Sequence, residues 1–285
     1  MTPDSRALSR AVLRRHARSF SWAARLLPPR VRADATALYA WCRRCDDAVD
    51  LAPDPATARA ALARLRAELD DVYGARDLAE PMLAGFQDVV RRVALPRRPC
   101  DELLDGMEMD LGSEIRYASF DELVVYCRRV AGTVGLLMAH LCGVRDAATL
   151  ATASDLGVAM QLTNICRDVA EDERRGRVYV PAELLRGVRV PTAGGADTSR
   201  AVAELLRRAD DFYGRGDRGL AALPASCGLA MRAARLIYAE IGAVIARRGC
   251  DVTRGRAVVS PARKLWLVVR AFWGALVVPR RRLAA

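Results

Sequence analysis

The side chains best suited to chemistry lie in one stripe of a predicted helix near the middle of the chain. At about 3.6 residues per turn, this stripe carries Gly157, Gln161, Asn164, Asp168 and Asp172. The adjacent face is apolar and is expected to be buried; it carries Val158, Leu162, Ile165 and Val169. Two carboxylates one turn apart, preceded by an amide oxygen, suit Mg²⁺, which proteins hold with a few carboxylates, water and substrate phosphates. The alternative is a solvated helix surface, on which Arg167 and Glu171 form an ordinary i, i+4 pair.

A second acidic stripe upstream strengthens the metal interpretation. A helix over this segment places Tyr39, Arg43, Asp46 and Asp50 on one face, with Asp47 beside them. If both stripes lined one cavity, their carboxylates would repel one another, and divalent cations would be the simplest means of neutralising them. Such cations attract phosphate, so the two stripes together predict a site that binds diphosphates.

The composition indicates a globular protein without a nucleic-acid partner. The chain has 285 residues, 52% of them hydrophobic, and no linker divides it, so we expect one domain spanning residues 1–285. The formal charge is +11, but Lys264 is the only lysine and the arginines are spread through amphipathic segments. Because the sequence has no recognisable nucleic-acid motif and no long basic run, we expect no nucleic acid as a partner.

Cysteine usage indicates a reducing compartment. The chain has 8 cysteines and no signal peptide, which is typical of the cytoplasm, where thiols stay free. Cys42 and Cys45 form a CxxC pair, but a zinc site needs further ligands, and the other cysteines are isolated. We therefore expect these two side chains to pack within the protein.

Helical periodicity dominates the chain, and no segment alternates for long enough to form a convincing strand. The predicted helices cover 5–18, 30–50, 56–73, 81–93, 100–111, 120–142, 146–174, 200–222 and 224–248, with a loop over 187–199. A run of small residues from Ala131 to Gly135 predicts a kink, a close approach of substrate to bare backbone, or close helix packing. A further apolar segment, 265–278, is too short to span a bilayer; we favour a core helix over an interfacial one.

The segment from Gly214 to Gly219 fits GxGxxG, the pattern of dinucleotide-binding loops. That fingerprint follows a β-strand and opens a helix, whereas this segment follows a polar stretch with helical periodicity. We interpret it as a helix end and a turn.

Six blocks of residues, from about Leu13 to Ala271, together carry a family resemblance. They are His16-x-x-Ser19-Phe20-Ser21; Leu38-Tyr39-Ala40-Trp41-Cys42-Arg43-x-Cys45-Asp46-Asp47-x-x-Asp50; Gly106-Met107-x-Met109-Asp110-Leu111 with Arg116-Tyr117; Tyr126-Cys127-x-x-Val130-Ala131-Gly132-Thr133-Val134-Gly135; Gln161-Leu162-Thr163-Asn164-Ile165-x-Arg167-Asp168-x-x-Glu171-Asp172; and Gly176-Arg177-Val178-Tyr179-Val180-Pro181. In these blocks the chain resembles the squalene and phytoene synthase family, and within it the bacterial phytoene synthases. The last two blocks together are highly specific.

The resemblance implies an all-α isoprenoid (prenyl) synthase fold with a central cavity and both aspartate motifs at its mouth. Mg²⁺, or Mn²⁺ in its place, would be held by Asp46, Asp47, Asp50, Asn164, Asp168 and Asp172. Substrate would be bound by His16, Ser19, Phe20, Arg43, Gln161, Asn164, Arg167, Arg263 and Lys264. The catalytic residues would be Tyr39, Arg43, Tyr126, Arg167 and Tyr238.

The activity that the resemblance implies is the head-to-head condensation of two C20 geranylgeranyl diphosphates to phytoene, through prephytoene diphosphate and with release of two diphosphates. No NADPH is expected, because the chain has no dinucleotide motif. Two alternatives stay open: a family member that converts C15 farnesyl diphosphate to presqualene diphosphate, squalene or dehydrosqualene, and a non-catalytic helical assembly protein on the same fold.

Two further expectations concern the prenyl chain and the membrane. Ala24 stands where a bulky aromatic would shorten a substrate channel, which favours C20 over C15 if Ala24 lines that channel; the alternative is that it packs against a neighbouring helix. A hydrocarbon product must leave into lipid, so we expect a cytoplasmic protein bound peripherally to a membrane surface. Contact with the carotenoid enzymes that act before and after it is also expected.

Overall fold

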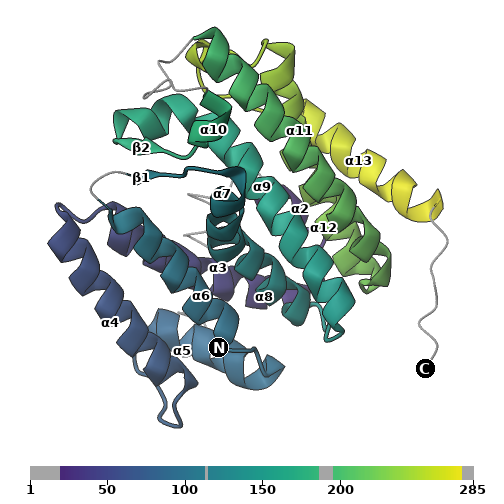
Figure 1. The fold of residues 1–285 in the computed structure, drawn as a ribbon. Helices are drawn as coiled ribbons and strands as arrows, with labels where there is room; N and C mark the ends of the chain where they lie inside the picture. The colour runs from purple at the N-terminus through teal and green to yellow at the C-terminus, as the bar shows by residue number, and fades with distance from the viewer. Residues whose placement is uncertain (1–19, 113–114, 186–194, 278–285) are drawn as a thin grey trace.

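α-Helices form almost all of the secondary structure in the computed structural model (Figure 1). The structure describes residues 20–112, 115–185 and 195–277. Its α-helices are α2 (Phe20–Ala24), α3 (Pro29–Asp50), α4 (Pro55–Tyr73), α5 (Pro81–Val93), α6 (Arg98–Glu108), α7 (Phe120–Cys127), α8 (Thr133–Leu141), α9 (Ala147–Arg174), α10 (Ala182–Leu185), α11 (Ala196–Gly219), α12 (Ala225–Arg247) and α13 (Pro261–Val277). The all-α prediction is confirmed, whereas the helix expected over 5–18 lies outside the described residues.

Local signals explain where many of these helices begin. Asp54 accepts a hydrogen bond from the backbone N–H of Thr57 at 2.8 Å and so caps α4. Asp146 caps α9 in the same way, through the N–H of Thr149 at 2.8 Å. Proline occupies the first turn of α3, α4, α5 and α6, where its missing N–H is not needed. These short-range signals are the reason that most of the predicted helix starts agree with the structure.

Three details of the prediction are wrong. The expected helix over 120–142 is interrupted by a π-helical segment, η2 (Arg128–Gly132), which lies between α7 and α8. The expected loop over 187–199 ends early, because α11 already begins at Ala196. The GxGxxG segment is the C-terminal end of α11, as predicted, but the turn comes only after Gly219, at the 3₁₀ segment η3 (Leu220–Ala222).

Two strands of two residues each were not expected from the sequence. β1 (Ile115–Arg116) and β2 (Arg177–Val178) pair in parallel, with Ile115 opposite Arg177. They are too short to show a period of two in the sequence. Their pairing fixes the segment that follows α9 beside the segment that follows α6 and the 3₁₀ segment η1 (Met109–Leu111).

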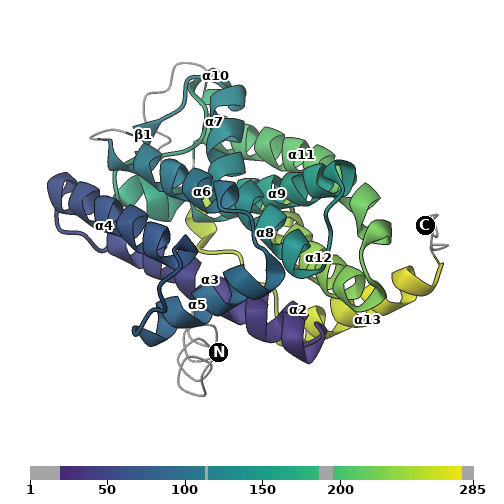
Figure 2. The ribbon, with the colours of Figure 1, turned by 90° about the horizontal axis from the view of Figure 1, so that it is seen from below.

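Helix α9 runs through the middle of the protein. In both views α4 and α5 lie on one side of it and α11, α12 and α13 on the other (Figures 1 and 2). The contact with α8 and η2 is especially close, because a Cβ added to Gly157 would lie 2.2 Å from the carbonyl oxygen of Ala131. A Cβ on Gly135 would likewise lie 2.2 Å from the carbonyl oxygen of Ala153. The run of small residues therefore allows close helix packing, as one of the predicted alternatives held.

The hydrophobic core lies on both sides of this helix. One cluster joins α7, α9, α11 and α12, and a second joins α3, α4, α5, α6 and α8. Trp41 is fully buried in the second cluster and stacks on Phe86 with ring centroids 4.8 Å apart. Cys45 is also fully buried there, and Cys42 packs against the same cluster with its thiol free. The CxxC pair is thus part of the packing, as predicted.

Helix α13 is only partly buried, which corrects the preference for a core helix. Leu267 and Ala271 are buried against the rest of the protein. The opposite face is exposed and apolar; it carries Leu265, Trp266, Val269, Phe272 and Trp273. No helix in the described part of the chain is both long and apolar enough to cross a membrane.

Candidate active site

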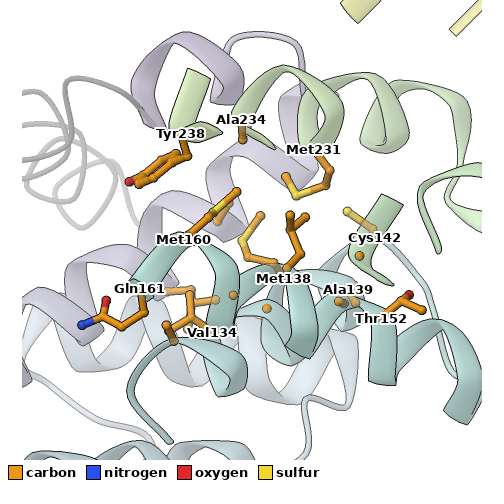
Figure 3. A pocket seen from close by; sticks show the side chains of 18 of the residues that line it. Val134, Met138, Ala139, Cys142, Thr152, Met160, Gln161, Met231, Ala234 and Tyr238 are labelled. Atoms are coloured by element: carbon orange, nitrogen blue, oxygen red, sulfur yellow. The ribbon is translucent and has the colours of Figure 1, made fainter. Parts of the chain in front are cut away.

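A long cavity passes between α3, α8, α9, α11 and α12 (Figure 3). Helix α9 contributes the stripe Thr149, Thr152, Ala153, Leu156, Gly157, Met160, Gln161 and Asn164. This spacing of three and four residues keeps one helical face toward the cavity over 15 residues, or about 22 Å at 1.5 Å per residue. Most of the lining side chains are apolar; Asp46, Gln161 and Asn164 are polar, as are Thr149 and Thr152 further along α9.

The first acidic motif lies at the C-terminal end of α3. Tyr39 and Asp46 line the cavity, as expected for residues on the same helical face. Asp50, one turn beyond Asp46, accepts a hydrogen bond from Arg177 at 2.9 Å. Asp47 points elsewhere, because it pairs with Arg43. Of the predicted metal ligands in this motif, the structure therefore places Asp46 at the cavity and Asp50 beside the guanidinium of Arg177.

The second acidic motif lies near the C-terminal end of α9. Gln161 and Asn164 line the cavity, and Asp168 and Asp172 continue the same stripe toward the helix end. Arg167 holds Asp168 in a two-pronged hydrogen bond, with Nε to Oδ1 at 2.9 Å. Arg256, from the segment between α12 and α13, approaches the same carboxylate with Nε to Oδ1 at 3.1 Å.

Arg177 lies close to carboxylates of both motifs. Arg177 on β2 pairs with Asp50 and also lowers the pKa of Asp172, although burial and the neighbouring Asp168 raise that pKa overall. Neither Arg177 nor Arg256 was singled out from the sequence as a site residue. Arg177 belongs to the block Gly176-Arg177-x-Tyr179-x-Pro181, which could have indicated it. No local pattern indicates Arg256, which is 88 positions away from Asp168 in the sequence.

A partly buried carboxylate, Asp110, lies near Arg177 and Asp50. Asp110 accepts hydrogen bonds from the hydroxyls of Tyr126, at 2.8 Å, and Tyr179, at 2.9 Å, and these two rings stack with centroids 5.1 Å apart. Burial raises the pKa of Asp110 to about 6, and the two donors and Arg177 oppose that rise. Tyr126 is not among the residues that line the cavity, and its hydroxyl is hydrogen-bonded to Asp110; its catalytic role stays a prediction.

The electrostatics of the mouth fit a divalent cation. Desolvation by the surrounding protein, and then the nearby Asp50, raise the pKa of Asp46 to about 7, although solvent still reaches this residue. Burial, and then Asp168, raise the pKa of Asp172 to about 7. Crowded carboxylates of this kind gain from a positive ion. The Oδ1 atom of Asn164 is buried without a hydrogen-bond partner, which suits an oxygen ligand to a cation.

The carboxylates do not form a complete metal site by themselves. Among the described residues, no three Asp, Glu, His or Cys side chains converge closely enough to hold an ion. This arrangement fits Mg²⁺, which keeps several water or phosphate ligands and uses one or two carboxylates per ion. Asp46 and Asn164 at the cavity, with Asp50, Asp168 and Asp172 beside it, are the residues that would hold it.

Two tyrosines line the cavity close to these groups. Burial raises the pKa of Tyr39 to about 12 and also raises the pKa of Tyr238. Both side chains are therefore neutral phenols at physiological pH, able to donate or accept a hydrogen bond without carrying charge. In Figure 3, Tyr238 lies at the same end of the cavity as Gln161.

Several predicted substrate contacts lie away from the cavity. Arg43 lies in a separate hollow beside α4 with Arg44 and Asp47. Arg263 hydrogen-bonds Glu240 at 2.9 Å and stacks on Trp266, while Lys264 is buried at the start of α13. Ion pairs hold two of these side chains where they are: Arg43 pairs with Asp47, and Arg263 pairs with Glu240.

The N-terminal contacts are only partly described. His16 and Ser19 lie outside the described residues, and for Phe20 only the backbone, at the start of α2, is described. Ala24 is buried in the second hydrophobic cluster and is not among the residues that line the cavity. It therefore packs against neighbouring helices, which was the alternative interpretation of this position.

Comparison with known proteins identifies the family. Residues 13–263 match the family described as squalene/phytoene synthase. The chain belongs to the squalene/phytoene synthase family.

Two curated relatives and one solved structure show how close the similarity within this family is. A phytoene synthase from Cereibacter sphaeroides is 43% identical, covering 94% of this chain and 79% of the relative. A phytoene synthase from Rhodobacter capsulatus is 39% identical, covering 92% of this chain and 79% of the relative. The structure of a dehydrosqualene synthase in complex with ligand superposes with a TM-score of 0.88 at 26% identity, covering 96% of this chain and 98% of that one. The expected isoprenoid synthase fold is thus confirmed.

Proposed function

We propose that this protein joins two geranylgeranyl diphosphates head to head to give phytoene. The observation that carries the proposal is a long, mainly apolar cavity with crowded carboxylates, an unpartnered amide oxygen and arginines at one end. A diphosphate fits the charged end and a prenyl chain fits the apolar length. The names of the two relatives, both phytoene synthases, support the C20 substrate.

The reaction begins with loss of diphosphate from one substrate, which leaves an allylic carbocation. Mg²⁺ would bind the diphosphate and stabilise its charge as the C–O bond breaks. Asp46, Asp50, Asn164, Asp168 and Asp172 would hold the metal. The apolar lining excludes water that would otherwise quench the cation.

The second half of the reaction uses the same cavity. The double bond of the second substrate attacks the cation, and loss of a proton closes a cyclopropane ring that still carries one diphosphate. A second ionisation, rearrangement and proton loss then gives the symmetric hydrocarbon. Tyr39 and Tyr238 are neutral groups at the charged end, where their oxygens can stabilise nearby positive charge or accept a proton. No reduction occurs in this sequence, so we expect no role for NADPH.

A product assay tests the proposal. The purified protein is incubated with Mg²⁺, or with Mn²⁺, and with geranylgeranyl or farnesyl diphosphate, each with and without NADPH. We expect phytoene from the C20 substrate, unchanged by NADPH, and no product in excess chelator. A predominant C30 product, or squalene that forms only when NADPH is added, would contradict the proposal.

A C15 substrate is the second candidate. It is favoured by the close superposition with a dehydrosqualene synthase. The two sequence relatives are more similar to this chain, at 43% and 39% identity against 26%, and for that reason we place the C20 substrate first. A purely structural role is not favoured, because both aspartate motifs are intact.

We also propose that α13 binds the membrane surface from one side. Its exposed apolar face includes Trp266 and Trp273, and the guanidinium of Arg263 lies 4.3 Å and that of Arg270 lies 5.7 Å from the ring centroid of Trp266. An apolar face bordered by arginine suits an anionic lipid surface, into which the hydrocarbon product can leave. Contact with neighbouring carotenoid enzymes stays a prediction.

Flotation with anionic liposomes at low and high salt tests the membrane proposal. We expect binding at low salt, and much weaker binding after replacing both tryptophans (Trp266→Glu with Trp273→Glu). Val125→Glu is the control, because Val125 on α7 is about as exposed as Trp266 but lies outside this face. Equal binding by the double variant and the control would reject α13 as the contact.

A further inference from the structure

The cavity has a far end, which the charged groups do not reach. In Figure 3, Gln161 and Tyr238 lie at one end of the cavity, and Thr152 and Cys142 lie at the other. From Asn164 to Thr152 the lining stripe of α9 covers 12 residues, or about 18 Å. A prenyl chain whose diphosphate is held near Asn164 therefore points its last isoprene unit toward Thr152.

The far end is made of uncharged side chains. Besides Thr152, it is bordered by Ala139 and Cys142, and by Thr149 one turn further along α9. Thr152 donates its hydroxyl hydrogen to the carbonyl oxygen of Thr149 at 2.7 Å, which satisfies the hydroxyl within its own helix. The end of the cavity can thus receive an apolar chain without leaving an unpaired polar group at this position.

Thr152 has room only because the neighbouring helix carries no side chain opposite it. A Cβ added to Gly219 on α11 would lie 1.8 Å from the Thr152 Oγ1 and 2.8 Å from its Cβ. Such contacts are too short, so any larger residue at position 219 would push the Thr152 side chain away from α11. Both residues line the cavity, so this displacement would narrow its end.

We propose that Thr152, together with Gly219, sets the length of prenyl chain that the cavity accepts. The inference rests on the proposed prenyl diphosphate activity. One turn of lining remains beyond Thr152, ending at Thr149 about 4.5 Å further along α9. That length is comparable to a single isoprene unit, which is the difference between C15 and C20 substrates. A bulky side chain at position 152 would close off this last turn of the cavity. A bulky side chain at position 24 would not, because Ala24 is not among the residues that line the cavity.

The test compares turnover of the two substrates by size variants on one helix. Thr152→Phe should lower the ratio of kcat/KM for geranylgeranyl over farnesyl diphosphate by at least about tenfold, since exclusion of even two methylenes from the cavity is worth that factor. Ala151→Phe is the matched control, because Ala151 is the exposed neighbour on α9 and its side chain points away from the cavity. The control should keep the wild-type ratio.

A second arm tests the contact between the two helices. Gly219→Ala should lower the same ratio by displacing Thr152, and adding Thr152→Gly should restore it, because glycine has neither the Oγ1 nor the Cβ that the new methyl group would meet. Helical circular dichroism and thermal unfolding of each variant show whether the fold is retained. If Thr152→Phe does not fold, Thr152→Leu takes its place with the same expected direction.

The outcomes separate this inference from the proposed function. Wild-type protein that converts neither substrate would refute the proposed function, and the chain-length inference would fall with it. Wild-type protein that makes phytoene, with a Thr152→Phe variant that keeps the wild-type ratio or loses both substrates equally, would overturn the chain-length role alone. A change of the same size in Ala151→Phe would also overturn it.

Discussion

Replacing Asp172 by asparagine should stabilise the metal-free protein at pH 8 and abolish turnover. Burial, and then Asp168, raise the pKa of Asp172 from 3.8 to about 7, so between these values the folded state binds more protons than the unfolded chain. The free energy of unfolding therefore falls as the pH rises through this window and stays reduced above it. Asparagine carries no charge at any pH, so the variant avoids this cost.

The expected gain can be estimated from the pKa. A rise from 3.8 to about 7 corresponds to at most about 4 kcal/mol at high pH. Asp172 is partly exposed, and solvent screens its interactions, so we expect about 1 to 2 kcal/mol. At pH 5 only about a third of the pH range between 3.8 and 7 has been crossed. The increase in the free energy of unfolding on replacing Asp172 by asparagine should then be roughly a third of its value at pH 8.

Urea unfolding in excess chelator at pH 5 and pH 8 measures this difference. Glu173→Gln is the matched control, because it removes a neighbouring negative charge at the same end of α9 and so accounts for the helix dipole. A gain that is equal at both pH values, or no larger than that of the control, would refute the pKa argument. Full turnover by Asp172→Asn with Mg²⁺ would refute the role of this carboxylate in metal binding.

Other predictions concern charge and packing. Arg177→Gln should lower the free energy of unfolding by about 1 kcal/mol in chelator, because Asp50 loses its partner, and the deficit should shrink when Mg²⁺ is added; urea titration with and without Mg²⁺ measures both. If Arg177→Gln leaves the free energy of unfolding in chelator unchanged, the ion pair between Arg177 and Asp50 does not contribute to stability. Gly157→Ala should destabilise the fold by about 1 to 3 kcal/mol, because its methyl group would lie 2.2 Å from the Ala131 carbonyl oxygen. Gly214→Ala meets nothing within 4 Å in the middle of α11 and should stabilise by about 0.5 to 1 kcal/mol, so thermal unfolding should shift in opposite directions for the two glycines. A shift in the same direction would contradict the close packing of η2 on α9.

Local sequence determined most of the helices and the composition of the acidic stripes. Proline and aspartate at helix starts act within one turn, and a helix fixes which residues share a face, so Asp46 with Asp50 and Asp168 with Asp172 could be grouped without any structure. The GxGxxG segment shows the limit of such signals. Its glycines suggested a turn, but in the structure α11 continues through them, and Gly219 serves the packing against Thr152.

Tertiary packing alone decided which groups meet across the chain. Arg177 reaches Asp50 over 127 positions, and Arg256 reaches Asp168 over 88, because strand pairing and helix packing bring these segments together. The same packing turned Arg43 and Arg263 away from the cavity, buried Ala24 in the core and left one face of α13 exposed. Residue type and spacing specify which face of an element a side chain occupies. Which neighbour covers that face depends on contacts between segments far apart in sequence, and a local sequence pattern does not predict those contacts.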